Sequence, residues 1–245
     1  MNAPPRLDLN RHALFADLDG TLTPIRPRPE DVGPDAERAQ LLHRLGEVLG
    51  GALAVVSGRG LDDLDRILGS EVAAVAAVHG LELRRPDGQI ERFAPPLPRE
   101  VGEAIRAFVA AWPPLTAEDK GLSIALHYRA DPSAAEASVL FAQTLADAHG
   151  LTLQPGDMVV ELRAPGPGKG GSVAAFMQAA PFSGRTPVFI GDDFTDESGF
   201  DTAQRLGGFG VIVGPRRPTN AQYALDDVAA ALDWLKTSVG AAPGG

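Results

Sequence analysis

Two aspartates near the N-terminus, Asp17 and Asp19, have the type and spacing of a pair of functional carboxylates. They directly follow the short apolar run 13–16 and precede Gly20. In an extended chain alternate side chains project to the same side, so both carboxylates can face one site. Gly20 permits the tight turn that must follow. The stretch therefore predicts two carboxylates aimed at one point, at the end of a buried strand.

A second acidic cluster follows the apolar run 188–190 and contains Asp192, Asp193 and Asp196. Because the carboxyl ends of parallel strands meet at one edge of a sheet, the two acidic segments can converge there. Bringing several carboxylates together is costly unless a cation neutralises them. The chain has no cysteine, so the ligands on offer are oxygens, and Mg²⁺ fits best.

A hydroxyl and a lysine supply what phosphate chemistry needs beside the carboxylates. Ser57 follows the apolar run 53–56, and Lys169 lies at a predicted helix start, where the backbone favours anions. An aspartate nucleophile, a metal, a lysine and a hydroxyl make a complete set for phosphoryl transfer. Each segment alone is common, since aspartates near turns often act as caps. Their joint placement after strand-like runs supports the functional interpretation.

Short aliphatic runs alternate with helical patterns along most of the chain and predict the elements that position these residues. The strand-like runs cover residues 13–16, 53–57, 75–78, 188–190 and 211–213. The helical patterns cover residues 35–49, 61–68 and 172–179. Strands that alternate with helices imply βαβ units and a mainly parallel sheet, so the predicted fold class is α/β with a Rossmann-like core.

The middle of the chain follows a different pattern. After the proline-rich residues 94–98, helical patterns over 99–112 and 133–149 are interleaved with strand-like runs. The run 122–129 alternates as a half-solvated antiparallel strand does. We therefore expect an α+β module at residues 98–165, inserted into a discontinuous core that is built from residues 1–97 and 166–245.

Composition excludes several classes of protein. The chain has 245 residues and a net charge of −10. No run approaches the ~18 apolar residues of a membrane span, and the N-terminus has no apolar signal region. We therefore expect a cytoplasmic protein without a membrane contact. Nothing forms a basic stripe for nucleic acid, but an acidic protein can still carry a local basic pocket for a phosphorylated substrate.

The glycine-rich segment 166–171, GPGKGG, suggests a rival function because it fits the dinucleotide-binding pattern GxGxxG. It follows the strand-like run 158–163 and precedes a helix, and Asp192 lies about 20 residues further on. A dinucleotide-binding oxidoreductase is therefore an alternative, although prolines and a lysine disrupt the loop and Asp17 and Asp19 stay unexplained. A phospho-accepting receiver domain is a third interpretation, which the length and the inserted module oppose.

These segments, as they stand, resemble the haloacid dehalogenase (HAD) superfamily of phosphatases and, within it, the trehalose-6-phosphate phosphatase family. The superfamily likeness rests on DLDGT at residues 17–21, SGR at 57–59, Lys169 and GDD at 191–193. HYR at 127–129, VELR at 160–163 and the TPI that follows DGTL carry the narrower likeness. One departure is Leu18, where many relatives have an aromatic residue, and its side chain is not expected to enter the chemistry.

The resemblance implies a role for each matching residue of the core. Asp17 would be the nucleophile that forms an aspartyl-phosphate. Asp19 would be the general acid that protonates the sugar oxygen and then the base that activates water. Ser57 would hydrogen-bond the phosphoryl group, and Lys169 would offset its charge.

The resemblance also implies the metal site. Mg²⁺ would be held by Asp17, the backbone carbonyl of Asp19, and Asp192. Asp193 and Asp196 would be further ligands or would orient the ligands.

The inserted module resembles the cap of the family, which closes on the sugar and excludes water. The residues that match substrate-binding positions are Glu118, Lys120, Arg129 and Glu161 in the module, and Arg59 and His79 in the core. Polar groups that form several hydrogen bonds suit sugar hydroxyls. A solvated turn or a structural ion pair is the alternative for the module residues.

We therefore expect a Mg²⁺-dependent phosphatase that hydrolyses trehalose 6-phosphate, a small-molecule substrate. The same chemistry on another sugar phosphate, of the sucrose or mannosyl type, is an alternative, because only the resemblance specifies the disaccharide. No fused synthase fits in 245 residues, so a separate trehalose-phosphate synthase is the expected functional partner. The expected oligomeric state is a monomer.

Overall fold

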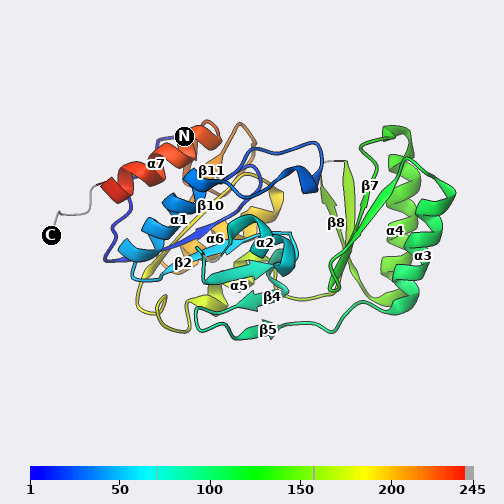
Figure 1. Ribbon diagram of the computed structural model, residues 1–245, viewed down its shortest axis with the longest axis horizontal. Helices are drawn as coiled ribbons and strands as arrows, with labels where there is room; N and C mark the ends of the chain where they lie inside the picture. Colours follow the sequence, from blue (N-terminus) through cyan, green and yellow to red (C-terminus); the bar gives the residue numbers. More distant parts are fainter. Residues whose placement is uncertain (70, 157, 241–245) are drawn as a thin grey trace. The chain divides into compact units, whose positions relative to one another are not determined.

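The protein divides into two compact units in a computed structural model that describes residues 1–69, 71–156 and 158–240 (Figure 1). Unit 1 consists of Met1–Glu91 and Pro167–Gly245, and unit 2 consists of Arg92–Gly166. Unit 2 begins before residue 98, where the sequence predicts a boundary. The Leu97 N–H donates to the Gly121 carbonyl at 2.9 Å, which ties the preceding segment to unit 2.

Unit 1 contains an eight-stranded sheet. Its strands in spatial order are β12 (Tyr223–Leu225), β11 (Phe209–Val213), β10 (Thr186–Gly191), β1 (His12–Ala16), β2 (Leu53–Val56), β3 (Ala74–Ala77), β4 (Glu82–Arg84) and β5 (Ile90–Arg92). The first six pair in parallel, and β4 joins β3 antiparallel. This mainly parallel sheet with crossover helices confirms the predicted α/β class.

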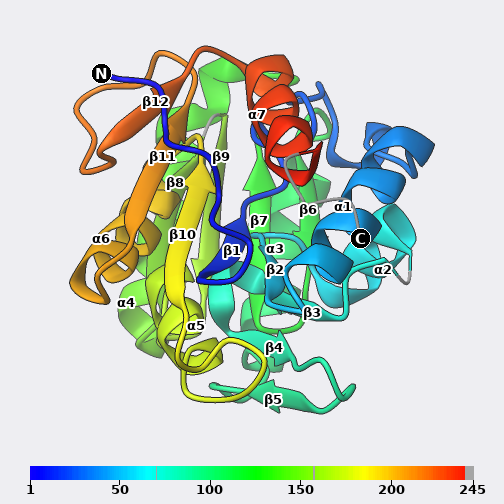
Figure 2. The same ribbon diagram turned by 90° about the vertical axis from the view of Figure 1, so that its left-hand side faces the viewer.

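Helices of unit 1 pack in neighbouring pairs beside the sheet. They are α1 (Ala36–Val48), α2 (Leu61–Leu68), α5 (Lys169–Phe176), α6 (Glu197–Arg205) and α7 (Val228–Gly240), with the 3-10 turns η1 (Pro29–Asp31), η2 (Val78–Gly80) and η4 (Phe194–Asp196). Helix α1 contacts α7, and α5 contacts α6 (Figure 2). Within the described residues, none of the helices combines the length and the apolar character that a membrane crossing requires.

The centre of the sheet lies where the strand order reverses. The chain proceeds from β1 to β2 on one side, and β10 lies on the other side of β1. In open parallel sheets ligands bind at the carboxyl ends of the strands at such a switch point. The strand register pairs Ala16 with Ile190, so the residues that follow β1 and β10 leave the sheet together.

Aromatic packing attaches α5 to β1. The Phe15 ring of β1 lies 6.1 Å from Phe176 at the end of α5 and 5.4 Å from Phe182, and Phe176 and Phe182 lie 5.1 Å apart. All three side chains are buried, and aromatic groups of this size contribute strongly to core stability. The helix that begins at Lys169 is therefore fixed against the strand that leads to Asp17.

Unit 2 is an α+β unit with an antiparallel sheet. Its strands in spatial order are β6 (Thr116–Asp119), β7 (Ser123–His127), β9 (Val159–Arg163) and β8 (Thr152–Gly156), and its helices are α3 (Arg99–Ala111), η3 (Pro132–Ala134) and α4 (Ala135–His149). Ile124, Leu126, Val160 and Leu162 form the buried core of one sheet face. Helices α3 and α4 cover that face (Figure 1), so the alternate residues of each strand project from the other face.

Candidate active site

The carboxyl ends of β1 and β10 carry the acidic residues that the sequence predicts to converge. Asp17 follows β1 directly, and its backbone N–H donates to the Ile190 carbonyl at 2.9 Å. One carboxylate oxygen from each of Asp17, Asp192 and Asp196 lies within 4.8 Å of the others. The structure therefore brings Asp17 together with Asp192 and Asp196, which belong to a segment far away in the sequence.

Lys169 connects the two acidic segments. Its Nζ lies 2.7 Å from Asp17 Oδ1 and 2.7 Å from Asp196 Oδ1, and all three side chains are buried. Burial opposes the charge on the ammonium group, but the carboxylates of Asp17 and Asp196 outweigh burial and raise the pKa of Lys169. Lys169 is thus a fixed, buried cation beside the predicted nucleophile.

Asp196 and Asp193 shape the loop after β10. The second oxygen of Asp196, Oδ2, accepts the backbone N–H groups of Asp192 and Asp193 at 3.0 and 3.1 Å. Asp193 Oδ1 accepts the Thr195 N–H at 2.7 Å and its hydroxyl at 2.6 Å. Since both oxygens of Asp196 already have donors, its geometry suits the orientation of the loop better than direct metal ligation.

The cluster carries an excess of negative charge. With every group ionised, Asp17, Asp192 and Asp196 bring three negative charges against one positive charge from Lys169, which leaves two. Burial raises the pKa of Asp17 well above its usual range, and burial with the neighbouring Asp196 and Asp193 raises the pKa of Asp192 to about 7. Burial also raises the pKa of Asp196 to about 6. A divalent cation would offset this excess.

The spacing of the oxygens fits a small divalent cation. Two ligands on opposite sides of an octahedral Mg²⁺ lie about 4.2 Å apart, twice the Mg–O distance of about 2.1 Å. One oxygen of Asp17 and one of Asp192, the two carboxylates left for ligation, lie within 4.8 Å of each other, so small side-chain adjustments suffice. The buried acidic cluster is therefore compatible with Mg²⁺.

Gly20 allows the two acidic segments to approach each other. Its φ of +83° is in the left-handed region, and a Cβ at this position would lie 2.1 Å from Asp192 Oδ2. Its N–H donates to the Thr23 carbonyl at 2.7 Å and closes the turn. Both the backbone conformation and the contact therefore require glycine after Asp19.

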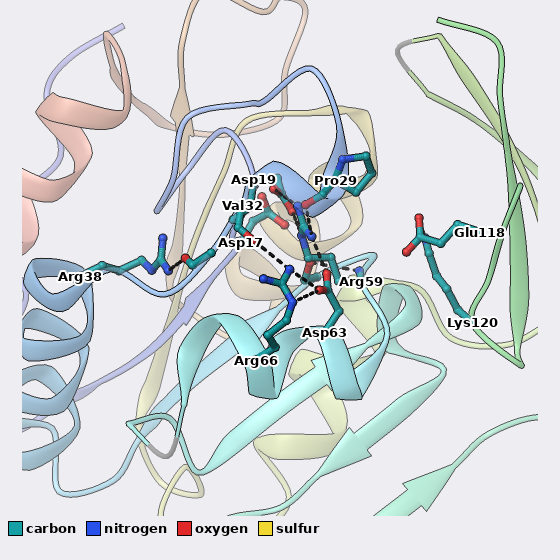
Figure 3. Close-up of polar contacts among 12 residues, drawn as sticks. Asp17, Asp19, Pro29, Val32, Arg38, Arg59, Asp63, Arg66, Glu118 and Lys120 are labelled. Atoms are coloured by element: carbon teal, nitrogen blue, oxygen red, sulfur yellow. Dashed lines mark hydrogen bonds and ion pairs between the residues drawn. The ribbon is translucent and has the colours of Figure 1, made fainter. Parts of the chain in front are cut away.

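Arg59 holds the Asp19 carboxylate. Its Nε lies 2.6 Å from Asp19 Oδ2 and its Nη2 lies 2.8 Å from Asp19 Oδ1 (Figure 3). Nη1 donates to the Pro29 carbonyl at 3.0 Å and to Asp63 of α2. Burial opposes the charge on the guanidinium, but Asp19 and Asp63 outweigh burial and raise the pKa of Arg59. Arg59, predicted to contact substrate, is thus bonded to the predicted proton donor.

Asp63 is absent from the predicted set. Asp63 lies in the first turn of α2, four residues after Arg59, and Arg59 itself precedes the helix, so no helix pattern indicates this contact.

The turn η2 supports the segment that contains Ser57. The His79 N–H donates to the Ser57 carbonyl and the Val78 N–H to the Arg59 carbonyl, both at 2.9 Å. Val78 and His79 have φ of +48° and +55°, a region that costs energy for residues other than glycine. A Cβ on Gly58 would lie 2.4 Å from His79 Nε2, so the ring packs directly on this segment. The structure therefore places His79 beside the predicted phosphate-binding serine.

A row of register partners crosses the sheet of unit 2 on the face opposite its helices. Glu118 pairs with Ala125, Ala125 with Glu161, and Glu161 with Gln154. The row brings two of the predicted sugar-binding residues, Glu118 and Glu161, onto one face of one sheet.

Further polar side chains surround this row. Lys120 Nζ lies 3.3 Å from each oxygen of Glu161 and 3.9 Å from Glu118 Oε2 (Figure 3 shows Glu118 and Lys120). The Ser123 hydroxyl donates to Glu161 at 2.5 Å, and His127 Nε2 lies 3.5 Å from Glu118 Oε2. Ser123 and His127 are additions to the predicted set, and their alternation along β7 is the signal that could have found them.

The pKa of Glu118 reflects this environment. Burial would raise the pKa of its carboxyl, but the neighbouring His127 ring and the charge of Lys120 outweigh burial and lower it. Arg129, also in the predicted set, is exposed and lies two residues after the end of β7.

The segment 166–171 does not support the oxidoreductase alternative. The strand before it, β9, belongs to the antiparallel sheet of unit 2, whereas a dinucleotide-binding loop joins a strand of a parallel sheet to a helix. A Cβ on Gly170 would lie 2.1 Å from the Ser198 carbonyl, so this glycine permits close packing of α5 on α6. The predicted alternative is therefore wrong.

Comparison with known proteins agrees with this geometry. A family model described as Trehalose-phosphatase matches residues 15–229. The chain belongs to the trehalose-phosphatase family. The match covers most of unit 1 and all of unit 2, and it confirms the resemblance that the motifs indicate.

Two relatives of this trehalose-phosphatase family member illustrate the range of the family. The trehalose-6-phosphate phosphatase of Escherichia coli (strain K12) is 40% identical over 229 residues, which cover 92% of this chain and 86% of that protein. The bifunctional trehalose-6-phosphate synthase/phosphatase of Thermoproteus tenax is 37% identical over 225 residues, which cover 89% of this chain but only 30% of that protein.

A solved structure matches the fold of this family member. The C-terminal domain of the C. albicans trehalose-6-phosphate phosphatase gives a TM-score of 0.82 over 96% of this chain and 98% of that chain, at 21% sequence identity. At this identity the likeness concerns the fold, and it agrees with the predicted core and inserted α+β unit.

Proposed function

We propose that this chain hydrolyses trehalose 6-phosphate to trehalose and inorganic phosphate through an aspartyl-phosphate on Asp17. The observation that carries the proposal is the buried contact between Asp17 and Lys169, 2.7 Å long, at the end of β1. Burial raises the pKa of Asp17, but the contact with Lys169 opposes this effect and favours the ionised carboxylate, which is the form that attacks phosphorus. Membership of the trehalose-phosphatase family supports the choice of substrate.

The proposed reaction has two displacements at phosphorus. A carboxylate oxygen of Asp17 attacks, the bond between phosphorus and the sugar oxygen breaks, and Asp19 gives its proton to that oxygen. Water then attacks the aspartyl-phosphate, Asp19 takes a proton from the water, and the bond between phosphorus and Asp17 breaks. Lys169 and the Ser57 hydroxyl offset the charge on the phosphoryl oxygens during both steps.

The proposed ligands of Mg²⁺ are Asp17, Asp192 and the backbone carbonyl of Asp19. The bound ion would supply Lewis-acid neutralisation of the phosphoryl oxygens. Asp196 and Asp193 orient the ligands in this proposal, because their oxygens accept hydrogen bonds within the loop after β10.

Unit 2 is proposed to be the cap that recognises the sugar, with the domain boundaries near residues 97 and 166. Its sheet presents Glu118, Lys120 and Glu161 on one face, and they contact one another through the ammonium group of Lys120. Carboxylates and an ammonium group that form hydrogen bonds can exchange these bonds for hydroxyl groups of a sugar. Arg129 and the core residues Arg59 and His79 complete the proposed substrate-binding set.

A separate synthase is the proposed source of the substrate. The T. tenax relative is named a synthase/phosphatase, and this chain matches only 30% of its length. In that relative the name joins the two activities in one protein, which supports a synthase as the source of the substrate. The proposed phosphatase unit is a monomer of this chain.

Phosphate release from a panel of sugar phosphates tests the proposal. The panel contains trehalose 6-phosphate, sucrose 6-phosphate, a mannosyl phosphate and glucose 6-phosphate, each with Mg²⁺ and with EDTA. We expect a preference for trehalose 6-phosphate, dependence on Mg²⁺, and loss of turnover in Asp17→Asn.

The outcomes separate the parts of the proposal. Equal rates on all sugars would contradict the substrate and retain the phosphatase chemistry. Full activity of Asp17→Asn would contradict the nucleophile. Asp65→Asn, on an exposed part of α2, is the matched control and should retain the native rate.

A further inference from the structure

Asp63, in the first turn of helix α2, is a charged residue to which the proposed reaction gives no role. Its two carboxylate oxygens bind two different arginines (Figure 3). Oδ2 accepts a hydrogen bond from Arg59 Nη1 at 2.5 Å, and Oδ1 accepts hydrogen bonds from Arg66 Nε and Nη2 at 3.0 and 2.6 Å. Asp63 therefore connects the guanidinium that holds Asp19 to a helix.

The helix gives Asp63 a fixed position. Leu64, Ile67 and Leu68 bury the apolar side of α2 in unit 1. The Leu64 N–H donates to the Gly60 carbonyl at 3.0 Å and closes the first turn of the helix. Groups on packed helices are held more precisely than groups on loops. The place of the Asp63 carboxylate is thus set by the core of unit 1 as well as by its arginine partners.

The guanidinium of Arg59 is fixed on two sides. Its Nε and Nη2 share one edge, and both face the carboxylate of Asp19, at 2.6 and 2.8 Å. Nη1 lies outside that edge, and it donates to Asp63 and to the Pro29 carbonyl. Because a guanidinium is planar and rigid, the partners of Nη1 set the direction in which the edge of Nε and Nη2 points. Asp63 therefore orients the group that holds Asp19.

The charge of Asp63 has a second effect on this contact. The Arg59 side chain is only 8% exposed, and a buried cation that loses its carboxylate partner is costly. With Asp63 ionised, Arg59 has two carboxylate partners, so Asp19 can turn one oxygen away while the cation stays paired. Without the charge of Asp63, the pairing of Arg59 would depend on Asp19, and the release of Asp19 would cost more.

We infer that Asp63 is a positioning residue for the proton transfer by Asp19 and that it acts through Arg59. The inference rests on the proposed function, in which Asp19 gives its proton to the sugar oxygen as the bond between that oxygen and phosphorus breaks. Asp63 touches no reacting atom in this role. Its charge and its place on α2 allow Asp19 to give up one bond to Arg59 and to face the leaving oxygen.

The leaving group of the substrate provides the test. The sugar oxygen of trehalose 6-phosphate needs a proton as it departs, whereas 4-nitrophenolate is a stable anion and departs without one. In the proposed reaction kcat/KM reports the steps up to the aspartyl-phosphate, which include the step where Asp19 acts as the acid. The measurement is therefore kcat/KM with trehalose 6-phosphate and with 4-nitrophenyl phosphate, both in the presence of Mg²⁺.

Asp63→Asn removes the charge of this residue and keeps its size. We expect kcat/KM to fall at least about tenfold with trehalose 6-phosphate, a part of the roughly 10²–10⁴-fold that a general acid contributes, and to change less than about twofold with 4-nitrophenyl phosphate. Asp63→Glu keeps the charge and should retain a higher kcat/KM with trehalose 6-phosphate than Asp63→Asn. Asp62→Asn is the matched control, because Asp62 is an exposed acid in the same turn of α2, and it should act like the native chain on both substrates.

Two results with Asp63→Asn would overturn the inference. An equal loss with both substrates would assign Asp63 a structural role only, and a native kcat/KM with trehalose 6-phosphate would exclude any role. Asp19→Asn separates these results from a failure of the proposed function, since it should lose far more kcat/KM with trehalose 6-phosphate than with 4-nitrophenyl phosphate. If Asp19→Asn loses equally with both substrates, the proposed acid is wrong and the inference falls with it. If Asp19→Asn behaves as expected and Asp63→Asn does not, the inference about Asp63 alone is wrong.

Discussion

Replacing Lys169 with methionine removes the cation that contacts both Asp17 and Asp196 and leaves their carboxylates buried. Breaking a buried ion pair costs about 3–5 kcal/mol. Because burial already raises the pKa of Asp17, protonation relieves part of this cost, and the lower end of the range applies. For a chain of this size about 1 kcal/mol corresponds to roughly 2–4 °C in Tm, so we expect Tm to fall by roughly 6–12 °C.

The same substitution should abolish most of the activity. Lys169 Nζ is bonded to the proposed nucleophile at 2.7 Å, and it is the proposed counter-charge for the phosphoryl oxygens. Loss of one fixed donor of this kind lowers kcat by about 10²–10³-fold. Thermal unfolding followed by circular dichroism measures the first effect, and phosphate release at saturating substrate measures the second.

A double variant separates stability from chemistry. Lys169→Met with Asp196→Asn removes one of the uncompensated charges, so Tm should recover by at least half while kcat stays low. Lys236→Met is the control, because this lysine is paired with Glu37 at the surface and should change stability by less than about 1 kcal/mol. An unchanged Tm in Lys169→Met, or recovery of kcat in the double variant, would refute the role of the buried cation.

Three further predictions concern the residues around this cation. Burial raises the pKa of Asp192 from its ordinary value of 3.8 to about 7. The stability that the protonated Asp192 carboxyl contributes to the metal-free protein is therefore present below pH 3.8 and is lost as the pH rises through 7. Mg²⁺ should therefore raise Tm more at pH 8 than at pH 5.5. The measurement is the difference in Tm between samples with Mg²⁺ and samples with EDTA, and an equal difference at the two pH values would contradict this prediction. Gly20→Ala should destabilise the protein by about 1–3 kcal/mol and weaken the rise of Tm with Mg²⁺, because the new Cβ meets Asp192. Gly46→Ala is the control, since a Cβ at this helix position meets no atom within 4 Å, and it should not destabilise the protein. His79→Asn should melt above His79→Ala, since asparagine tolerates the left-handed φ of +55°, and identical Tm values would argue against strain in η2.

The strands that position the site are predictable because both of their faces are buried. β1, β2, β3, β10 and β11 read as short, nearly continuous apolar runs, as strands at the centre of a parallel sheet do. β6 is different, because its residues are TAED and mostly exposed at a sheet edge. Such a segment has no apolar periodicity, so Glu118 reads as part of a turn until the sheet is known.

The start of α5 shows a second limit of sequence patterns. The apolar helical pattern covers residues 172–179, and the helix begins at Lys169, where the motif predicts a helix start. Two glycines follow Lys169 and lower the local helix propensity. Packing of Gly170 on the Ser198 carbonyl compensates for this, and that contact depends on α6, which is remote in the sequence. The motif indicates that Lys169 matters, but only the tertiary structure shows which carboxylates it contacts.

The contact between Arg59 and Asp19 bears directly on the proposed proton transfer by Asp19. Arg59 binds both oxygens of Asp19, and release of one of these bonds would free that oxygen to face the leaving oxygen in the proposed proton transfer. Each charge-assisted bond is worth about 1.5–3 kcal/mol, which is a substantial part of a catalytic barrier. Arg59, however, also binds Asp63 and the Pro29 carbonyl through Nη1. Its guanidinium therefore keeps a carboxylate partner when Asp19 is released, and this lowers the cost of the state in which Asp19 can act as an acid.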